Sequence, residues 1–257
     1  MEYIIICIIS LLGSGLTLFS GFGLGTLLTP VFAIFFPIEL AIGMTAVVHF
    51  LNNVFKFFLL GKHADKNLVL KFGIPSLIAA FLGAWVLTKI SGMPSLFDYS
   101  LNEKVFSITP VKLTIALLLI FFALAEAFPS LTKLKFKNEH FILGGLLSGF
   151  FGGLSGNQGA LRTAFLVKAN LAKEQFIATG IIIACMVDVS RLIVYNKLDS
   201  LYNTDVNYKL IAASVLCAFA GAYFGNLFLK KVTINFIQKL VAAMLLVFAV
   251  LLGAGIL

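Results

Sequence analysis

The chain has 257 residues, of which 60% are hydrophobic and only 12% are charged, and its formal net charge is +8. Soluble domains of this size carry about 25% charged residues, so this composition excludes an ordinary soluble protein and indicates transmembrane helices. Most of the positive excess falls in a few short loops. We therefore attribute it to membrane topology, with the lipid bilayer as a partner, and expect no nucleic acid.

Apolar segments follow one another along the whole chain, without the strand-like alternation over about ten residues that is typical of membrane barrels. This pattern predicts an all-α polytopic membrane protein with about 8–10 membrane segments. Six segments reach the roughly 20 residues that span a bilayer, whereas 22–36, 140–155 and 157–169 are too short to span comfortably. In chain order, the segments are 3–20, 22–36, 39–60, 68–90, 107–128, 140–155, 157–169, 174–195, 208–229 and 235–257.

The segment pairs 3–36 and 140–169 are predicted to be glycine-broken hairpins of tilted helices or re-entrant half-helices. Non-helical backbone at membrane depth is tolerated only where protein or a water-filled cavity satisfies it. Other glycines, in Gly145-x-x-x-Gly149 and Gly221-x-x-x-Gly225, suit close helix contact and need no ligand. The glycines assigned to the helix breaks are Gly21, Gly23, Gly25, Gly153, Gly156 and Gly159.

Each hairpin precedes three longer segments, and four short matches recur in the same order in both halves. Residues 81–85 (FLGAW) resemble 219–223 (FAGAY), and Asn53-x-x-Lys56 resembles Asp188-x-x-Arg191. Because three is odd, the second half would enter the membrane from the opposite side, as in the inverted-topology repeats of secondary transporters. The alternative is chance similarity among apolar segments. We divide the chain into a first repeat at 1–128, a basic cytoplasmic linker at 129–139 and a second repeat at 140–257.

The lysines predict the orientation of the chain. Eleven lysines lie in the loops near 61–71, 129–139, 168–173 and 230–239, against five on the other side. Under the positive-inside rule, the lysine-rich side is cytoplasmic and both termini face outward. Met1-Glu2-Tyr3 has no basic residue, so we expect the first segment to be retained. The three cysteines lie in apolar segments without metal-ligand spacing, and we expect no disulfide, metal or cofactor.

Polar side chains inside the apolar segments mark the candidate site, because each charged one costs at least about 2.5–3.5 kcal/mol at a helix centre. His49, Asn53 and Lys56 recur at helical spacing and can share one face. Asp188 and Arg191 are three residues apart and can form an ion pair that also gates a pathway.

Arg162 lies in the second hairpin beside Asn157 and Gln158. We interpret these residues, with His49, Asn53, Lys56 and Arg191, as lining a net-positive cavity for a small anion. Free amides of the broken helices would add to this potential, and the arginine fork suits oxyanions. His49 would coordinate the substrate or carry a proton.

Structural alternatives stay open for these residues. Lys56 can snorkel to the cytoplasmic surface, and Asp188 can simply neutralise Arg191. His49 can be an ordinary helix-contact histidine, Arg162 can be structural, and Asn157 and Gln158 can cap a helix.

The two glycine-rich hairpins carry a resemblance to a known family. Gly21-Phe22-Gly23-Leu24-Gly25 with Pro30, and the second run from Gly149 to Gly159, make the chain similar over nearly its full length to the sulfite exporter TauE/SafE family, also called the 4-toluene sulfonate uptake permease family. The resemblance implies an integral protein of a bacterial-type plasma membrane with duplicated halves, which moves sulfite, sulfonates or related organosulfur anions. Ala164 replaces an expected proline, and Asn157, Gln158 and Arg162 depart from a plain glycine cluster.

Three functions follow from these observations. The first is a secondary transporter, exporter or permease, of a small sulfur-containing anion, working by alternating access around a midplane site. The second is a passive anion channel with the same lining. The third, an enzyme using His49 with Asp188 or Glu126, lacks zinc-type and nucleophile-elbow motifs, so we expect no enzyme. No Walker-type loop is present, so protons or the membrane potential would drive transport. Whether the chain forms a homo-oligomer stays open.

Overall fold

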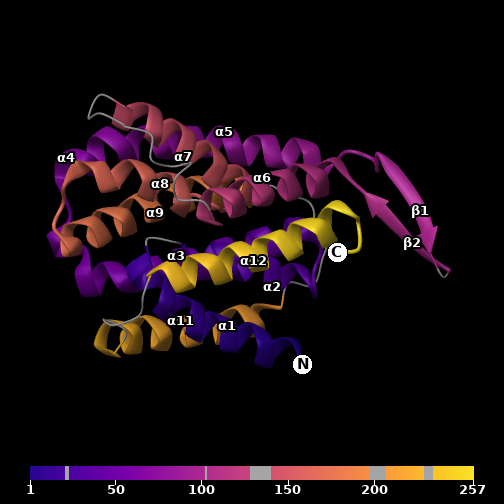
Figure 1. Ribbon diagram of the computed structural model, residues 1–257, viewed down its shortest axis with the longest axis horizontal. Helices are drawn as coiled ribbons and strands as arrows, with labels where there is room; N and C mark the ends of the chain where they lie inside the picture. The colour runs from indigo at the N-terminus through magenta and orange to yellow at the C-terminus, as the bar shows by residue number, and fades with distance from the viewer. Residues whose placement is uncertain (21–22, 102, 128–139, 197–206, 229–233) are drawn as a thin grey trace.

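The computed structural model describes residues 1–20, 23–101, 103–127, 140–196, 207–228 and 234–257. Helices dominate these residues, which confirms the all-α polytopic fold class (Figure 1). The first half contains α1 (Glu2–Ser20), α2 (Gly25–Ala33), α3 (Ile38–Leu60), η1 (Gly61–His63), α4 (Lys66–Leu68), η2 (Val69–Gly73), α5 (Ile74–Ser91), β1 (Phe97–Leu101), β2 (Lys104–Ile108) and α6 (Pro110–Ala127). The second half contains α7 (Phe141–Ser155), α8 (Gly159–Leu166), η4 (Val167–Ala169), α9 (Lys173–Tyr195), α11 (Tyr208–Phe228) and α12 (Ile234–Gly253).

The helices differ in their ability to cross a bilayer. Among the described residues, four stretches are long and apolar enough to do so: Ile38–His63, Lys66–Ser91, Lys173–Tyr195 and Tyr208–Leu227. The sequence predicted six, but the described apolar parts of α6 and α12 are shorter. The helices α2 and α8 have nine and eight residues, so they rise only about 14 and 12 Å against a hydrocarbon core of about 30 Å.

A β-hairpin, which the sequence analysis missed, connects α5 to α6. The strands β1 and β2 pair antiparallel, with Phe97 opposite Ile108 and Leu101 opposite Lys104. The predicted apolar segment 107–128 is therefore wrong at its start, since Ser107 and Ile108 belong to β2. The residue before a proline is biased to extended backbone, and Pro110 favours the first turn of α6.

The β-hairpin lies at the same end of the molecule as both termini, whereas α4 lies at the opposite end (Figure 1). Tyr99 Oη donates a hydrogen bond of 2.6 Å to the carbonyl oxygen of Ala254, just beyond α12. Lys112 Nζ donates to the carbonyl oxygens of Ser107 and Gly255. The C-terminal residues therefore hold the β-hairpin against the start of α6.

The two halves pack into each other rather than side by side. The helix α1 packs against α11, and α5 packs against α7, while α3 meets α9 and α6 meets α12. If α1 corresponds to α7 and α5 to α11, the first two contacts are the same contact made twice, as across a two-fold axis. This pairing favours the predicted repeat. The opposite insertion of the halves stays a prediction.

Glycines allow the closest helix contacts. A Cβ on Gly83 of α5 would overlap the carbonyl oxygen of Phe150 on α7, and a Cβ on Gly221 of α11 would overlap that of Leu11 on α1. Gly83 and Gly221 are the matched glycines of the two halves, so each makes the same kind of contact with a helix of the other half. Gly149 meets the backbone of Ser76 in the same way. These contacts agree with the packing role that the sequence predicted for the Gly-x-x-x-Gly pairs.

Candidate functional site

The helix breaks of the two hairpins lie next to each other. The helix α7 ends at Ser155, and Gly156 caps it in the left-handed region at φ 78°, donating to the carbonyl oxygen of Gly152. A Cβ on Gly25, the first residue of α2, would lie 3.4 Å from the carbonyl oxygen of Gly156. Gly159 begins α8. The backbone at the start of α2 therefore contacts the break between α7 and α8.

Three of the six assigned break glycines need comment. Gly153 was assigned to a helix break, but it lies inside α7, where its missing side chain admits the backbone of Ala80 on α5. That assignment is wrong, because Gly153 serves helix packing. Gly21 lies outside the described residues. Gly23 lies against His49, with a Cβ at that position only 2.7 Å from His49 Nε2.

The predicted polar stripe of α3 is buried. His49, Asn53 and Lys56 are 1%, 6% and 4% exposed. Lys56 Nζ donates to the carbonyl oxygen of Ser14 on α1 at 3.3 Å, and Asn52 can accept from it at 3.2 Å with its amide turned. Lys56 therefore does not snorkel to the surface, and its described hydrogen-bond partners are neutral oxygens.

An ionic network joins α3 to α9. His49 Nδ1 lies 2.7 Å from Asp188 Oδ2, and Asn53 Nδ2 donates to the same oxygen at 3.3 Å. Arg191 Nε donates a hydrogen bond to Asp188 Oδ1 at 2.9 Å. Arg191 Nη2 lies 2.8 Å from the same oxygen and completes the ion pair, but it forms no second hydrogen bond. The predicted ion pair of Asp188 and Arg191 thus forms. His49, from the other half, also contacts Asp188.

Asn157 and Gln158 lie in the break between α7 and α8, where both are buried. Asn157 Oδ1 and Gln158 Oε1 have no hydrogen-bond partner among the described residues. Gln158 makes no side-chain cap on α8, so the capping alternative fails for it. Buried amide oxygens without partners cost free energy, which makes this break a place where a ligand or water donor would stabilise the fold.

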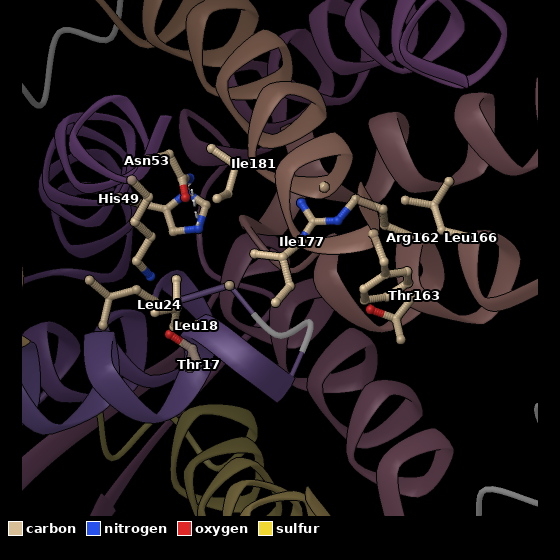
Figure 2. A pocket seen from close by; sticks show the side chains of 14 residues that line it. Thr17, Leu18, Leu24, His49, Asn53, Arg162, Thr163, Leu166, Ile177 and Ile181 are labelled. Carbon is tan, nitrogen blue, oxygen red and sulfur yellow. Dashed lines mark hydrogen bonds between the residues drawn. The ribbon is translucent and has the colours of Figure 1, made fainter. Parts of the chain in front are cut away.

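A cavity lies between these elements. Figure 2 shows His49 and Asn53 on one side of it and Arg162 with Thr163 on the other, with Ile177 and Ile181 of α9 between them. Its volume is about 30 Å³, which is room for one or two water molecules. The lining residues are Thr17, Leu18, Gly23, Leu24, His49, Asn53, Lys56, Arg162, Thr163, Leu166, Phe176, Ile177, Gly180 and Ile181.

The structure thus brings four predicted residues, His49, Asn53, Lys56 and Arg162, to one cavity. Four others, Asn157, Gln158, Asp188 and Arg191, do not line it. Asp188 and Arg191 lie behind His49, and a Cβ on Gly156 would be 2.6 Å from Arg191 Nη1, so Arg191 contacts the helix break instead.

The buried charges at this site are unbalanced. Lys56, Arg162 and Arg191 are each 6% exposed or less, and Asp188 is the only buried carboxylate among the described residues. Among the described residues, three buried basic side chains therefore stand against one buried carboxylate. Each buried ion costs several kcal/mol of desolvation unless opposite charge compensates it. A bound anion would provide that compensation.

Sequence reasoning missed two features of the site. It did not assign the α1 residues Ser14 and Thr17, although Ser10, Ser14 and Thr17 recur at helical spacing and are all buried. It also did not predict that Asn53 and Asp188 touch. Their matched positions in the two halves were the signal, because equivalent residues near a two-fold axis contact each other.

One comparison with known proteins identifies the family. The family model described as "Sulfite exporter TauE/SafE" matches residues 6–252. A search of curated proteins found no match. The family match covers both hairpins and every helix that contributes to the cavity.

Proposed function

The chain belongs to the sulfite exporter TauE/SafE family of membrane transporters, and from that membership we propose that it is a secondary transporter of a small sulfur-containing anion such as sulfite or an organosulfonate. Its residues would bind and release the anion unchanged, without enzymatic turnover. The membrane would be a bacterial-type plasma membrane, with both termini outside.

The excess of basic side chains over carboxylates at the cavity carries this proposal. Lys56 and Arg162 reach the cavity from different halves, and Asp188 is the only buried carboxylate among the described residues. An oxyanion between Lys56 and Arg162 would accept hydrogen bonds from both, and the arginine fork matches two oxygens of one sulfonate or sulfite group.

The placement of the cavity walls supports alternating access. The halves supply opposite walls, with α1 and α3 from one and α8 and α9 from the other. Rocking of one half against the other would enlarge the cavity toward one side of the membrane at a time. An inside-negative potential would favour export of an anion that crosses without a coupled cation by about 2.3 kcal/mol per charge per 100 mV.

Anion binding is tested by ligand-dependent thermal stabilisation of the purified protein. Sulfite, sulfate, methanesulfonate and a carboxylate control would be compared, since saturation at 100 times Kd stabilises by about 2.7 kcal/mol. Arg162→Ala should abolish the stabilisation, whereas Lys168→Ala, an exposed cation just beyond α8, should retain it. An equal response of both variants would remove the site from consideration.

Flux measurements in proteoliposomes distinguish a carrier from a channel. A carrier shows saturation and counterflow, in which anion on one side speeds exit of labelled anion from the other. Unitary currents without counterflow would overturn alternating access and favour the passive channel.

A further inference from the structure

His49 has one ring nitrogen fixed and the other directed to the cavity. Nδ1 lies 2.7 Å from Asp188 Oδ2, while Nε2 faces Gly23 in the cavity wall and lies 3.4 Å from Asn53 Nδ2. Arg191 binds the other oxygen of Asp188 and so favours its ionised form, which accepts hydrogen bonds only. The hydrogen-bond pattern therefore assigns the proton of neutral His49 to Nδ1 and leaves the lone pair on Nε2.

We propose that His49 Nε2 is a proton site coupled to the anion, so that the protein moves one proton together with each anion in the same direction. This inference rests on the proposed transport function and names its coupling ion. The proton enters Nε2 from water as the anion enters the cavity and leaves when the anion leaves, so no other reactant is needed.

The charges around His49 give the coupling its sign. Asp188 on α9 favours a protonated ring, whereas Lys56 on α3, Arg191 on α9 and Arg162 across the cavity oppose it. The described residues of α2 add no charge, and Lys209, the only charged residue described on α11, is exposed at its start. An anion between Lys56 and Arg162 offsets these cations and therefore favours protonation of His49.

Linkage makes the effect measurable from either side. If anion binding favours the proton, the proton favours the anion by the same factor. With one coupled proton, each increase of one pH unit raises the apparent Kd of the anion by up to about tenfold, in the range where His49 titrates. Binding takes up as much as one proton per anion.

Calorimetry tests the proton uptake with anions that do not themselves titrate near neutral pH. Binding of sulfate and methanesulfonate to the full-length protein would be measured in buffers of different ionisation enthalpy, which reports the protons taken up. Uptake should disappear in His49→Gln and persist in His63→Gln, an exposed histidine in the turn after α3. Anion binding without proton uptake in the wild-type protein would overturn the coupling and leave the transport proposal intact. Absence of binding by every anion tested would instead remove the transport proposal.

A spectroscopic measurement covers the case in which His49→Gln does not fold. The chain has three histidines, so ¹⁵N-histidine signals of His49 can be assigned by removing His63 and His140 instead. Addition of sulfate or methanesulfonate at fixed pH should shift the His49 nitrogens toward the doubly protonated pattern. A His49 ring whose protonation does not respond to a saturating anion would contradict the proposal.

Discussion

Substitution of Gly149 by alanine should destabilise the protein, although alanine is the better helix former. Gly149 lies in α7 with the backbone of Ser76 on α5 directly against it, and a Cβ there would lie 2.5 Å from Ser76 Cα and overlap its carbonyl oxygen. The obstacle is backbone on a rigid helix, so no rotamer change relieves it. Overpacking of this kind costs about 1–3 kcal/mol, which exceeds the roughly 0.5–1 kcal/mol that alanine gains over glycine in a helix.

Gly180 provides a matched control for Gly149. It lies in α9, but the nearest atom to a Cβ there is Arg162 Nε at 3.4 Å, an ordinary contact with a side chain. Gly180→Ala should therefore stabilise by about 0.5–1 kcal/mol. Thermal unfolding of the purified variants in one detergent compares the two. Changes of the same sign, or an unaltered Gly149→Ala protein, would refute the reasoning from the helix contact.

Three other predictions concern the ionic network, the β-hairpin and the topology. Asp188→Asn should cost about 3–5 kcal/mol in thermal or denaturant unfolding, because it leaves buried cations without their carboxylate; a loss under 1 kcal/mol would contradict the network. Hydrogen bonds from Ser107 and Ser95 hold the pKa of the exposed Asp98 below its ordinary value, so its stabilising effect is present at neutral pH and is lost as pH falls through that lowered pKa. Ser107→Ala should raise the pKa of Asp98 in an NMR titration, and an unmoved value would show that this hydrogen bond is unimportant. In a cysteine-free background, a membrane-impermeant thiol reagent should label Ser100→Cys but not Lys62→Cys in intact cells, and the reverse pattern would invert the proposed topology.

The helical segments could be predicted because each depends on a local property of the sequence. Runs of apolar residues mark the helices, and the glycine run ending at Gly156 marks the break after α7, where the left-handed backbone favours glycine. The β-hairpin escaped prediction because its strands have only five residues each and lie between apolar helices. Its aromatic row, Phe97, Tyr99 and Phe106, lies between the predicted apolar segments 68–90 and 107–128 and is apparent only once the cross-strand pairing is known.

The candidate site was predictable in its composition but not in its arrangement. Burial cost alone identified Lys56, Arg162 and Asp188, since a charged residue in an apolar segment needs a reason to be there. Which residue reaches the cavity depends on the angle at which α3 and α9 cross. That crossing angle cannot be predicted from a single sequence. Arg191 therefore turned out to contact Gly156 at the helix break, while Lys56 lines the cavity.

The reciprocal packing of the halves has a consequence for biosynthesis. Leu11 on α1 meets Gly221 on α11, 210 residues later in the chain. At a translation rate of about 5–20 residues per second, α1 waits roughly 10–40 s in the bilayer before its neighbour is made. During that time its contact surface faces lipid or other proteins, and the same holds for α5 until α7 emerges. Neither half can reach its final packing without helices of the other half. We therefore expect chains truncated after the first half to be degraded by membrane quality control.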